Sequence, residues 1–74
     1  MNQVNEYQYK IFNIKSVIEI TALSRSTIYE LINPKSKYYD PSFPKPLHLT
    51  QNRIGWLSKD IYAWLELKIA QREE

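Results

Sequence analysis

Side chains able to bind nucleic acid cluster in the middle of the chain. Arg25, Ser26, Thr27 and Tyr29 follow one another closely. A guanidinium group and hydroxyl groups can donate hydrogen bonds to phosphate oxygens and to acceptors on the edges of bases. We expect Arg25 to make the main base or phosphate contact, with the other three beside it. Ser24 is a further candidate contact, although Ser24 and Thr27 could instead only cap a helix.

Further polar side chains that could contact DNA come later in the chain. They are Lys35, Lys37 and Lys45, followed by Gln51, Asn52 and Arg53. The lysines are candidate phosphate ligands, although any exposed loop carries such residues. The other three occupy the expected tip of a hairpin, where an arginine can enter a narrow minor groove or hold the phosphate backbone. A solvated turn is the alternative for that tip.

Positive charge is concentrated in the same part of the chain, although the formal net charge is only +2. Residues 15–53 contain Lys15, Arg25, Lys35, Lys37, Lys45 and Arg53 against Glu19, Glu30 and Asp40. From residue 58 the balance reverses, with Lys59, Lys68 and Arg72 against Asp60, Glu66, Glu73 and Glu74. Such a distribution can present one positive face to a polyanion. An ordinary mixed-charge surface is the alternative.

Two short amphipathic helices are expected to position the central cluster. The spacing of apolar residues predicts a first helix that Asn13 caps and that ends near Thr21. A second helix is expected over residues 24–32, with Ser24 as its N-cap. Its outward face, opposite the apolar residues, carries Ser26, Tyr29, Glu30 and Asn33. Two short helices joined by a tight turn form a helix-turn-helix.

The second half of the chain predicts a wing and a third helix. Residues 35–46 contain several prolines and are expected to form a loop. Residues 47–49 and 53–56 are expected to pair as a short hairpin, and residues 10–12 are a further extended candidate. From Ser58, a predicted N-cap, apolar spacing predicts the longest helix, whose buried face is formed by Ile61, Trp64, Leu65 and Ile69. Phe43 and Trp56 are assigned to the core with Trp64.

The predicted fold class is therefore mainly α with a small β-hairpin, in the order helix-turn-helix, wing, helix. A chain of 74 residues accommodates a single domain. We expect a winged helix-turn-helix domain over residues 13–74, preceded by a partly disordered N-terminal arm of residues 1–12.

The composition argues against catalysis. His48 is the single histidine, Gly55 is the single glycine, and the chain has no cysteine. A thiolate zinc site, a disulfide framework and a glycine-rich phosphate loop are thereby excluded, and the acids lack metal-ligand spacing. We expect no enzyme, no catalytic residue, no metal and no cofactor. No signal peptide or membrane-spanning run is visible, so we expect a soluble, cytoplasmic protein without membrane contact.

Four separated motifs, in this order, resemble the AlpA family of small prophage and genomic-island regulators. They are the segments 23–29, Phe43–Pro46, Gly55–Trp56 and Asp60–Leu65. The resemblance covers most of the chain, from about Asn13 to Leu65.

The resemblance implies a compact winged-helix fold related to excisionases and to the DNA-binding domains of MerR-type regulators. It also implies that residues 24–32 are the recognition helix and residues 47–56 the wing. Family members activate transcription of a nearby integrase gene or act as recombination directionality factors. The sequence departs from the family at Ala22, where a turn glycine is usual, and in a longer connection between Ile32 and Phe43. That connection could contact DNA, a partner or only the core.

The sequence thus predicts a double-stranded DNA-binding transcriptional regulator or excisionase, with residues 24–32 in the major groove. The wing would lie at the minor groove or the phosphate backbone. An integrase and RNA polymerase are candidate partners, and we expect a monomer in solution or a weakly cooperative assembly on DNA. The alternative is a protein-interaction module, such as an antirepressor that binds another regulator through Tyr38, Tyr39 and the proline-rich loop.

Overall fold

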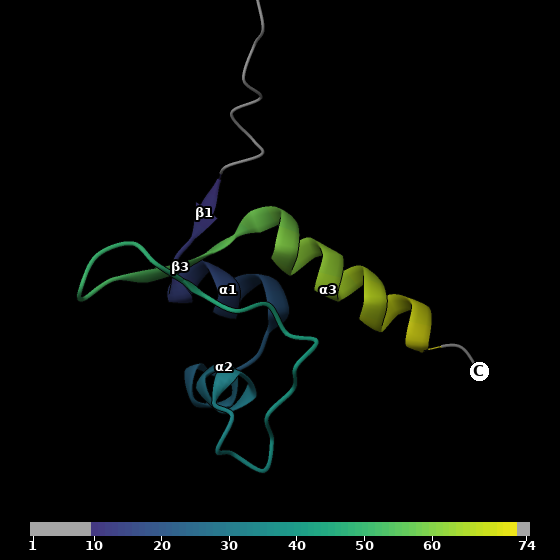
Figure 1. Ribbon diagram of the computed structural model, residues 1–74. Coiled ribbons are helices and arrows are strands. Elements are labelled where there is room, and N and C mark those ends of the chain that lie inside the picture. Colours follow the sequence, from purple (N-terminus) through teal and green to yellow (C-terminus); the bar gives the residue numbers. More distant parts are fainter. Residues whose placement is uncertain (1–9, 73–74) are drawn as a thin grey trace, which may run out of the picture.

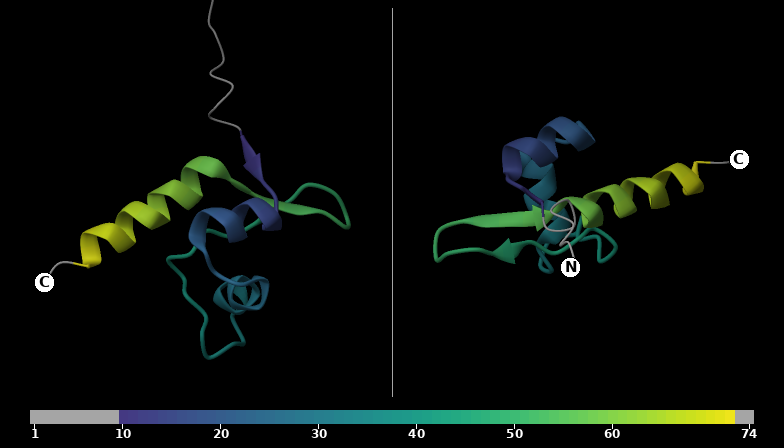
Figure 2. Two further views of the ribbon diagram at one scale, coloured as in Figure 1. Left: turned by 180° about the vertical axis from the view of Figure 1, so that it is seen from behind. Right: turned by 90° about the horizontal axis from the view of Figure 1, so that it is seen from above.

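Three helices and a small sheet make up the computed structural model, which describes residues 10–72 (Figure 1). In chain order the elements are β1 (Ile11–Phe12), α1 (Ile14–Thr21), α2 (Arg25–Ile32), β2 (Leu47–His48), β3 (Ile54–Leu57) and α3 (Ser58–Gln71). The hairpin of β2 and β3 projects from the body in the direction opposite to α3 (Figures 1 and 2). The predicted fold class is confirmed. Residues 1–9 of the predicted arm lie outside the described residues.

The helix starts of α1 and α2 are those predicted. The Asn13 side chain accepts a hydrogen bond from the backbone N–H of Ser16 at 2.9 Å. The Ser24 hydroxyl accepts one from the backbone N–H of Thr27 at 3.1 Å. Each cap satisfies a backbone donor that would otherwise lack a partner in the first turn of the helix. These caps fix where both helices begin.

The sheet has three strands rather than the two of the predicted hairpin. Strand β3 lies in the centre, with β1 and β2 antiparallel on either side, and the pair Phe12 and Trp56 stand opposite each other. Gly55 permits the close approach of β1, because a Cβ atom there would lie 3.2 Å from the backbone oxygen of Phe12. The wing is thus joined to the segment that precedes α1.

The core is small and draws on every part of the described chain. Its buried apolar residues are Phe12, Val17, Ile28, Phe43, Trp56 and Ile61. The predicted core positions of Phe43 and Trp56 are confirmed, and half-buried Trp64 packs against this cluster with its ring edge-on to Phe43. Because α1, α2, the sheet and α3 share one core, the orientation of α2 is fixed by all of them.

Helix α3 differs from its prediction at both ends. Ser58 is not its N-cap: Leu57 is, and no side chain caps the helix. Ser58 is instead buried, and its backbone N–H donates to the oxygen of Lys10 at 2.9 Å, which continues the β1–β3 pairing. Ile69 was expected in the core but is 51% exposed, because α3 extends beyond the body (Figure 1). Within residues 10–72, no helix is both long and apolar enough to span a membrane.

Candidate nucleic-acid interface

The turn between α1 and α2 sets the angle at which α2 leaves α1. Ala22 adopts the left-handed conformation, with φ 62° and ψ 18°, and its backbone N–H donates to the oxygen of Ile18 at 2.8 Å. The Thr21 hydroxyl supports the turn by accepting from the backbone N–H of Leu23 at 3.2 Å. A left-handed residue with a Cβ atom costs about 1 kcal/mol. Alanine therefore adopts here the left-handed conformation that glycine favours.

The outward face of α2 is polar and exposed. Ile28 is fully buried, whereas Arg25, Ser26, Thr27 and Tyr29 are all exposed. No acidic residue occurs in the first turn of the helix. The unpaired backbone N–H groups at a helix N-terminus favour an anion there, and Arg25 adds a full positive charge. This end of α2 is suited to a phosphate oxygen or to acceptor atoms on base edges.

The hydroxyls of Ser24 and Thr27 have different roles. The Ser24 oxygen caps the helix, as predicted, and its O–H donates to the Thr27 hydroxyl oxygen at 2.9 Å. That bond leaves the hydrogen of the Thr27 hydroxyl available to an external acceptor. Ser24 is therefore occupied by its capping role, while Thr27 can still donate.

The loop of residues 33–46 is tied to α2 and to the sheet along its length. The backbone N–H of Asp40 donates to the oxygen of Leu31 at 2.9 Å. The Trp56 indole N–H donates to the oxygen of Pro44 at 3.1 Å, and Phe43 fills the core. The loop is consequently an ordered part of the surface around α2.

Asp40 is the hydrogen-bonding centre of this loop. Its carboxylate accepts from the Ser42 hydroxyl at 2.7 Å and from the Ser42 backbone N–H at 2.9 Å. The Lys68 ammonium lies 3.9 Å away. The Ser42 hydroxyl, more than any other neighbour, holds the pKa of Asp40 below its ordinary value of 3.8, against a smaller opposing effect of burial.

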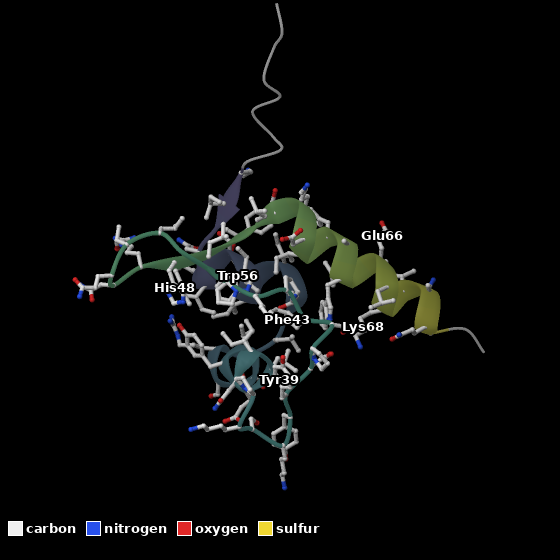
Figure 3. All side chains as sticks on the ribbon, in the orientation of Figure 1. Tyr39, Phe43, His48, Trp56, Glu66 and Lys68 are labelled. Atoms are coloured by element: carbon white, nitrogen blue, oxygen red, sulfur yellow. The ribbon has the colours of Figure 1, made fainter. Side chains whose placement is uncertain are left out.

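A groove separates the C-terminal end of α2 from the base of the wing. It has a volume of about 570 Å³ and is lined by Ile32, Pro34, Tyr39, Phe43, Lys45, Pro46, His48 and Ile54. Figure 3 shows His48 on the wing side and Tyr39 on the α2 side of this region. Lys45 is the predicted phosphate ligand that lies here, between the helix and the wing. Sequence reasoning placed Lys45 in a loop but did not foresee this setting.

The remaining predicted contacts lie at the tip of the hairpin and in the loop that follows α2. Gln51, Asn52 and Arg53 are exposed at the tip of the hairpin, as predicted. The tip is closed by backbone hydrogen bonds between Thr50 and Arg53 and between Leu49 and Arg53. Lys35 and Lys37 are exposed in the loop, where the Lys37 ammonium lies 5.4 Å from the centre of the Tyr38 ring.

The structure groups the predicted DNA contacts into three elements and adds residues that the sequence did not single out. Cations lie on α2 (Arg25), in the loop (Lys35, Lys37 and Lys45) and on the wing (Arg53). The loop residues Ser36 and Tyr38 reach the α2 surface, and Ser36 donates a hydrogen bond to Glu30. Only the unusual length of the loop pointed to this contact. No group of three acidic or histidine side chains within residues 10–72 could hold a metal ion.

Comparison with known sequences places this chain among prophage regulatory proteins. The profile of a family described as prophage CP4-57 regulatory protein (AlpA) matches residues 10–69. The DNA-binding transcriptional activator AlpA of Escherichia coli K12 is 39% identical over 61 residues, which cover 82% of this chain and 87% of that protein. An uncharacterized protein, ORF88, of Enterobacteria phage P4 is 33% identical over 66 residues, 89% of this chain and 68% of the phage protein. No solved structure matches the chain.

Proposed function

Since the chain belongs to the AlpA family of prophage regulatory proteins, we propose that it is a sequence-specific double-stranded DNA-binding regulator of transcription. The observation that carries this proposal is the outward face of α2. That face is polar and exposed, begins with Arg25 in the first turn, and belongs to a helix whose opposite side is anchored by fully buried Ile28. The family is one of regulatory proteins, in agreement with the expectation that the chain is not an enzyme.

In the proposed complex α2 enters the major groove. An α-helix fits that groove, and each base pair presents there a distinct pattern of hydrogen-bond donors and acceptors. Arg25, Ser26, Thr27 and Tyr29 contact bases or flanking phosphates from the first turns of α2. The Escherichia coli relative is a DNA-binding transcriptional activator, which supports DNA as the partner of this chain.

The loop and the wing contribute contacts outside the major groove. Lys35, Lys37 and Lys45 neutralise phosphates, and the residues at the tip of the wing approach the minor groove or its backbone with Arg53. With five or six phosphate contacts, the logarithm of affinity should fall against the logarithm of salt concentration with a slope of about −5. Occupancy of a site would then act by recruiting RNA polymerase, or by organising DNA for an integrase as an excisionase does.

Fluorescence anisotropy tests the proposal. The wild-type protein is titrated against DNA fragments that tile its own upstream region and the nearest integrase attachment site, over a series of salt concentrations. Saturable binding to one tile is expected, and Arg25→Ala should weaken it by about 1–3 kcal/mol. Arg72→Ala is the matched control, since Arg72 is an exposed arginine just beyond the last residue of α3. The position of the bound tile separates promoter control from excision.

Two results would contradict the proposal. Equal losses from Arg25→Ala and Arg72→Ala would exclude α2 as the recognition element. Binding to no tile above non-specific background, by a protein whose circular dichroism reports an intact fold, would favour the protein-interaction module. Contacts of that kind should respond little to salt, in contrast to phosphate binding.

A further inference from the structure

One acidic side chain stands on the face of α2 that otherwise suits DNA. Glu30 is exposed on the outward face, one helical turn after Ser26. A carboxylate there repels phosphates, and it lies in the last turn of α2, where the helix dipole favours cations. Neither the stability of α2 nor general attraction to a polyanion accounts for an acid at this position.

The carboxylate of Glu30 is held in place by the loop. The Ser36 hydroxyl donates a hydrogen bond to Oε1 of Glu30. The Ser36 oxygen in turn accepts from the backbone N–H of Tyr38 at 2.9 Å. The backbone N–H of Ser36 donates to the oxygen of Asn33 at 2.9 Å, which joins this turn to the end of α2. Glu30 is thus oriented by a chain of bonds that the loop supplies.

A cleft opens beside the oriented carboxylate. It has a volume of about 370 Å³ and is lined by Ser26, Thr27, Glu30, Leu31 and Tyr38. Leu31, the Thr27 methyl group and the Tyr38 ring give the cleft apolar walls, and Tyr38 is 61% exposed. The cleft therefore offers one hydrogen-bond acceptor at the edge of an apolar surface, on the side of the helix proposed to meet the bases.

We propose that Glu30 is a specificity-determining residue that accepts a hydrogen bond from the N4 amino group of a cytosine in the major groove. Ser36 is the positioning residue that holds the carboxylate in the required orientation. The apolar edge of the pyrimidine ring lies against Tyr38 and Thr27. This inference rests on the proposed function and names one base that α2 reads.

The chemistry of the carboxylate selects cytosine over the other bases. An ionised carboxylate can only accept hydrogen bonds. In the major groove, guanine presents two acceptors at N7 and O6, and thymine presents the O4 acceptor. Adenine offers an amino group but places the N7 acceptor beside it. Cytosine alone offers a donor without an adjacent acceptor on the same base, so Glu30 favours cytosine and disfavours the other three.

The test measures base preference, position by position, on the preferred binding fragment. Each base pair is replaced in turn, and affinities are compared for wild type, Glu30→Gln and Glu66→Gln. Glu66→Gln is the matched control, because it removes the same charge from an exposed site on α3 that points away from α2 (Figure 3). For wild type, one cytosine should be preferred on the order of tenfold. Glu30→Gln should lose that preference at that position alone, with a shift towards adenine, which glutamine pairs in a bidentate manner.

Ser36→Ala tests the positioning role. It keeps the charge of Glu30 and removes the hydrogen bond that orients the carboxylate, together with the bond that the Ser36 oxygen accepts from the backbone N–H of Tyr38. We expect Ser36→Ala to reduce the cytosine preference several-fold at the same position and to leave preferences at the other positions unchanged. Ser42→Ala, which removes another loop hydroxyl that bonds an acid, should leave the cytosine preference as it is in wild type.

The possible results separate this inference from the proposed function. If Glu30→Gln tightens binding to all fragments equally and no base preference changes, Glu30 acts only by repelling phosphates and the inference is wrong. If Ser36→Ala alters affinity but not base preference, Ser36 does not position the carboxylate and that part of the inference is wrong. If wild type itself prefers no base at any position, the proposed sequence-specific function fails and this inference fails with it.

Discussion

The two connections on either side of α2 hold the helix in different ways. The turn of Ala22, Leu23 and Ser24 acts through backbone geometry, with a left-handed residue and a capping serine. The loop of residues 33–46 is held by its Phe43 side chain, which is buried in the core, and by the Trp56 indole N–H of β3, which donates to the loop oxygen of Pro44. A short connection can fix an angle by its dihedrals, whereas a long one needs packing and hydrogen bonds to become rigid. The short turn therefore contains a strained left-handed residue, whereas the long loop is held by packing and hydrogen bonds.

Removing the main anchor of the loop should have the largest effect. Phe43 is 2% exposed and its ring centroid lies 4.9 Å from that of Trp64. Phe43→Ala should lower the free energy of unfolding by about 3–5 kcal/mol, because it leaves a cavity in a small core. Urea denaturation followed by circular dichroism measures this loss. Where the alanine variant does not fold, Phe43→Leu should still show a loss of roughly 1–2 kcal/mol.

Tyr38→Ala is the control for the loop. Tyr38 lies in the same loop but is 61% exposed, so its removal should change the free energy of unfolding by less than about 0.5 kcal/mol. Equal effects of Phe43→Ala and Tyr38→Ala would mean that the loop is not anchored through the core.

Relieving the strain of the short turn should have a smaller effect, of opposite sign. Ala22→Gly removes the steric cost of φ 62° and adds the backbone entropy of glycine to the unfolded chain. The net gain in the free energy of unfolding should be about 0.5–1 kcal/mol. Ala63→Gly, in the interior of α3, should instead cost about 1 kcal/mol. Destabilisation by both substitutions would contradict a strained turn.

Lowering the pH should remove the stability that the loop gains from Asp40, and it should not affect the short turn. The pKa of Asp40 is lowered in the folded protein, chiefly by the Ser42 hydroxyl. The folded state therefore binds fewer protons than the unfolded state, and the resulting stability is present above the unfolded pKa of about 4 and lost as the pH falls through the folded pKa. Asp40→Asn should lower the urea midpoint near neutral pH, and its difference from wild type should shrink below pH ~4. An unchanged difference across this range would exclude Asp40 as the titrating group.

Local signals in the sequence were sufficient for α1, α2 and the hairpin of the wing. Asn13 and Ser24 have the side chains that cap helices, and the apolar spacing around Ile28 marks the buried side of α2. The sequence did not indicate the left-handed conformation of Ala22, because alanine, unlike glycine, rarely adopts that conformation. It also did not indicate β1 pairing with β3, which depends on residues far apart in the chain. Ser58 was misassigned because its buried backbone pairing to Lys10 outweighs its capping tendency.

The part of the candidate site that lies within one helix could be predicted from the sequence. Ser26 and Tyr29 could be placed on the outward face of α2 from helical periodicity alone, whereas Arg25 and Thr27 flank the apolar residues near its N-terminus. The bond between Ser36 and Glu30 depends on how the loop folds back, for which the sequence carries no periodic signal. The roles of all these residues in binding DNA remain predictions.

The most direct test of the central claim, that α2 enters the major groove, maps where α2 lies on DNA. The chain contains no cysteine, so single cysteines at positions 26, 52 and 66 can each carry a DNA-cleaving reagent. Cleavage from position 26 should give the strand offset of the major groove, and cleavage from position 52 that of the minor groove. Position 66, on the far side of α3, should give none. Cleavage from position 66 but not from position 26 would contradict the account.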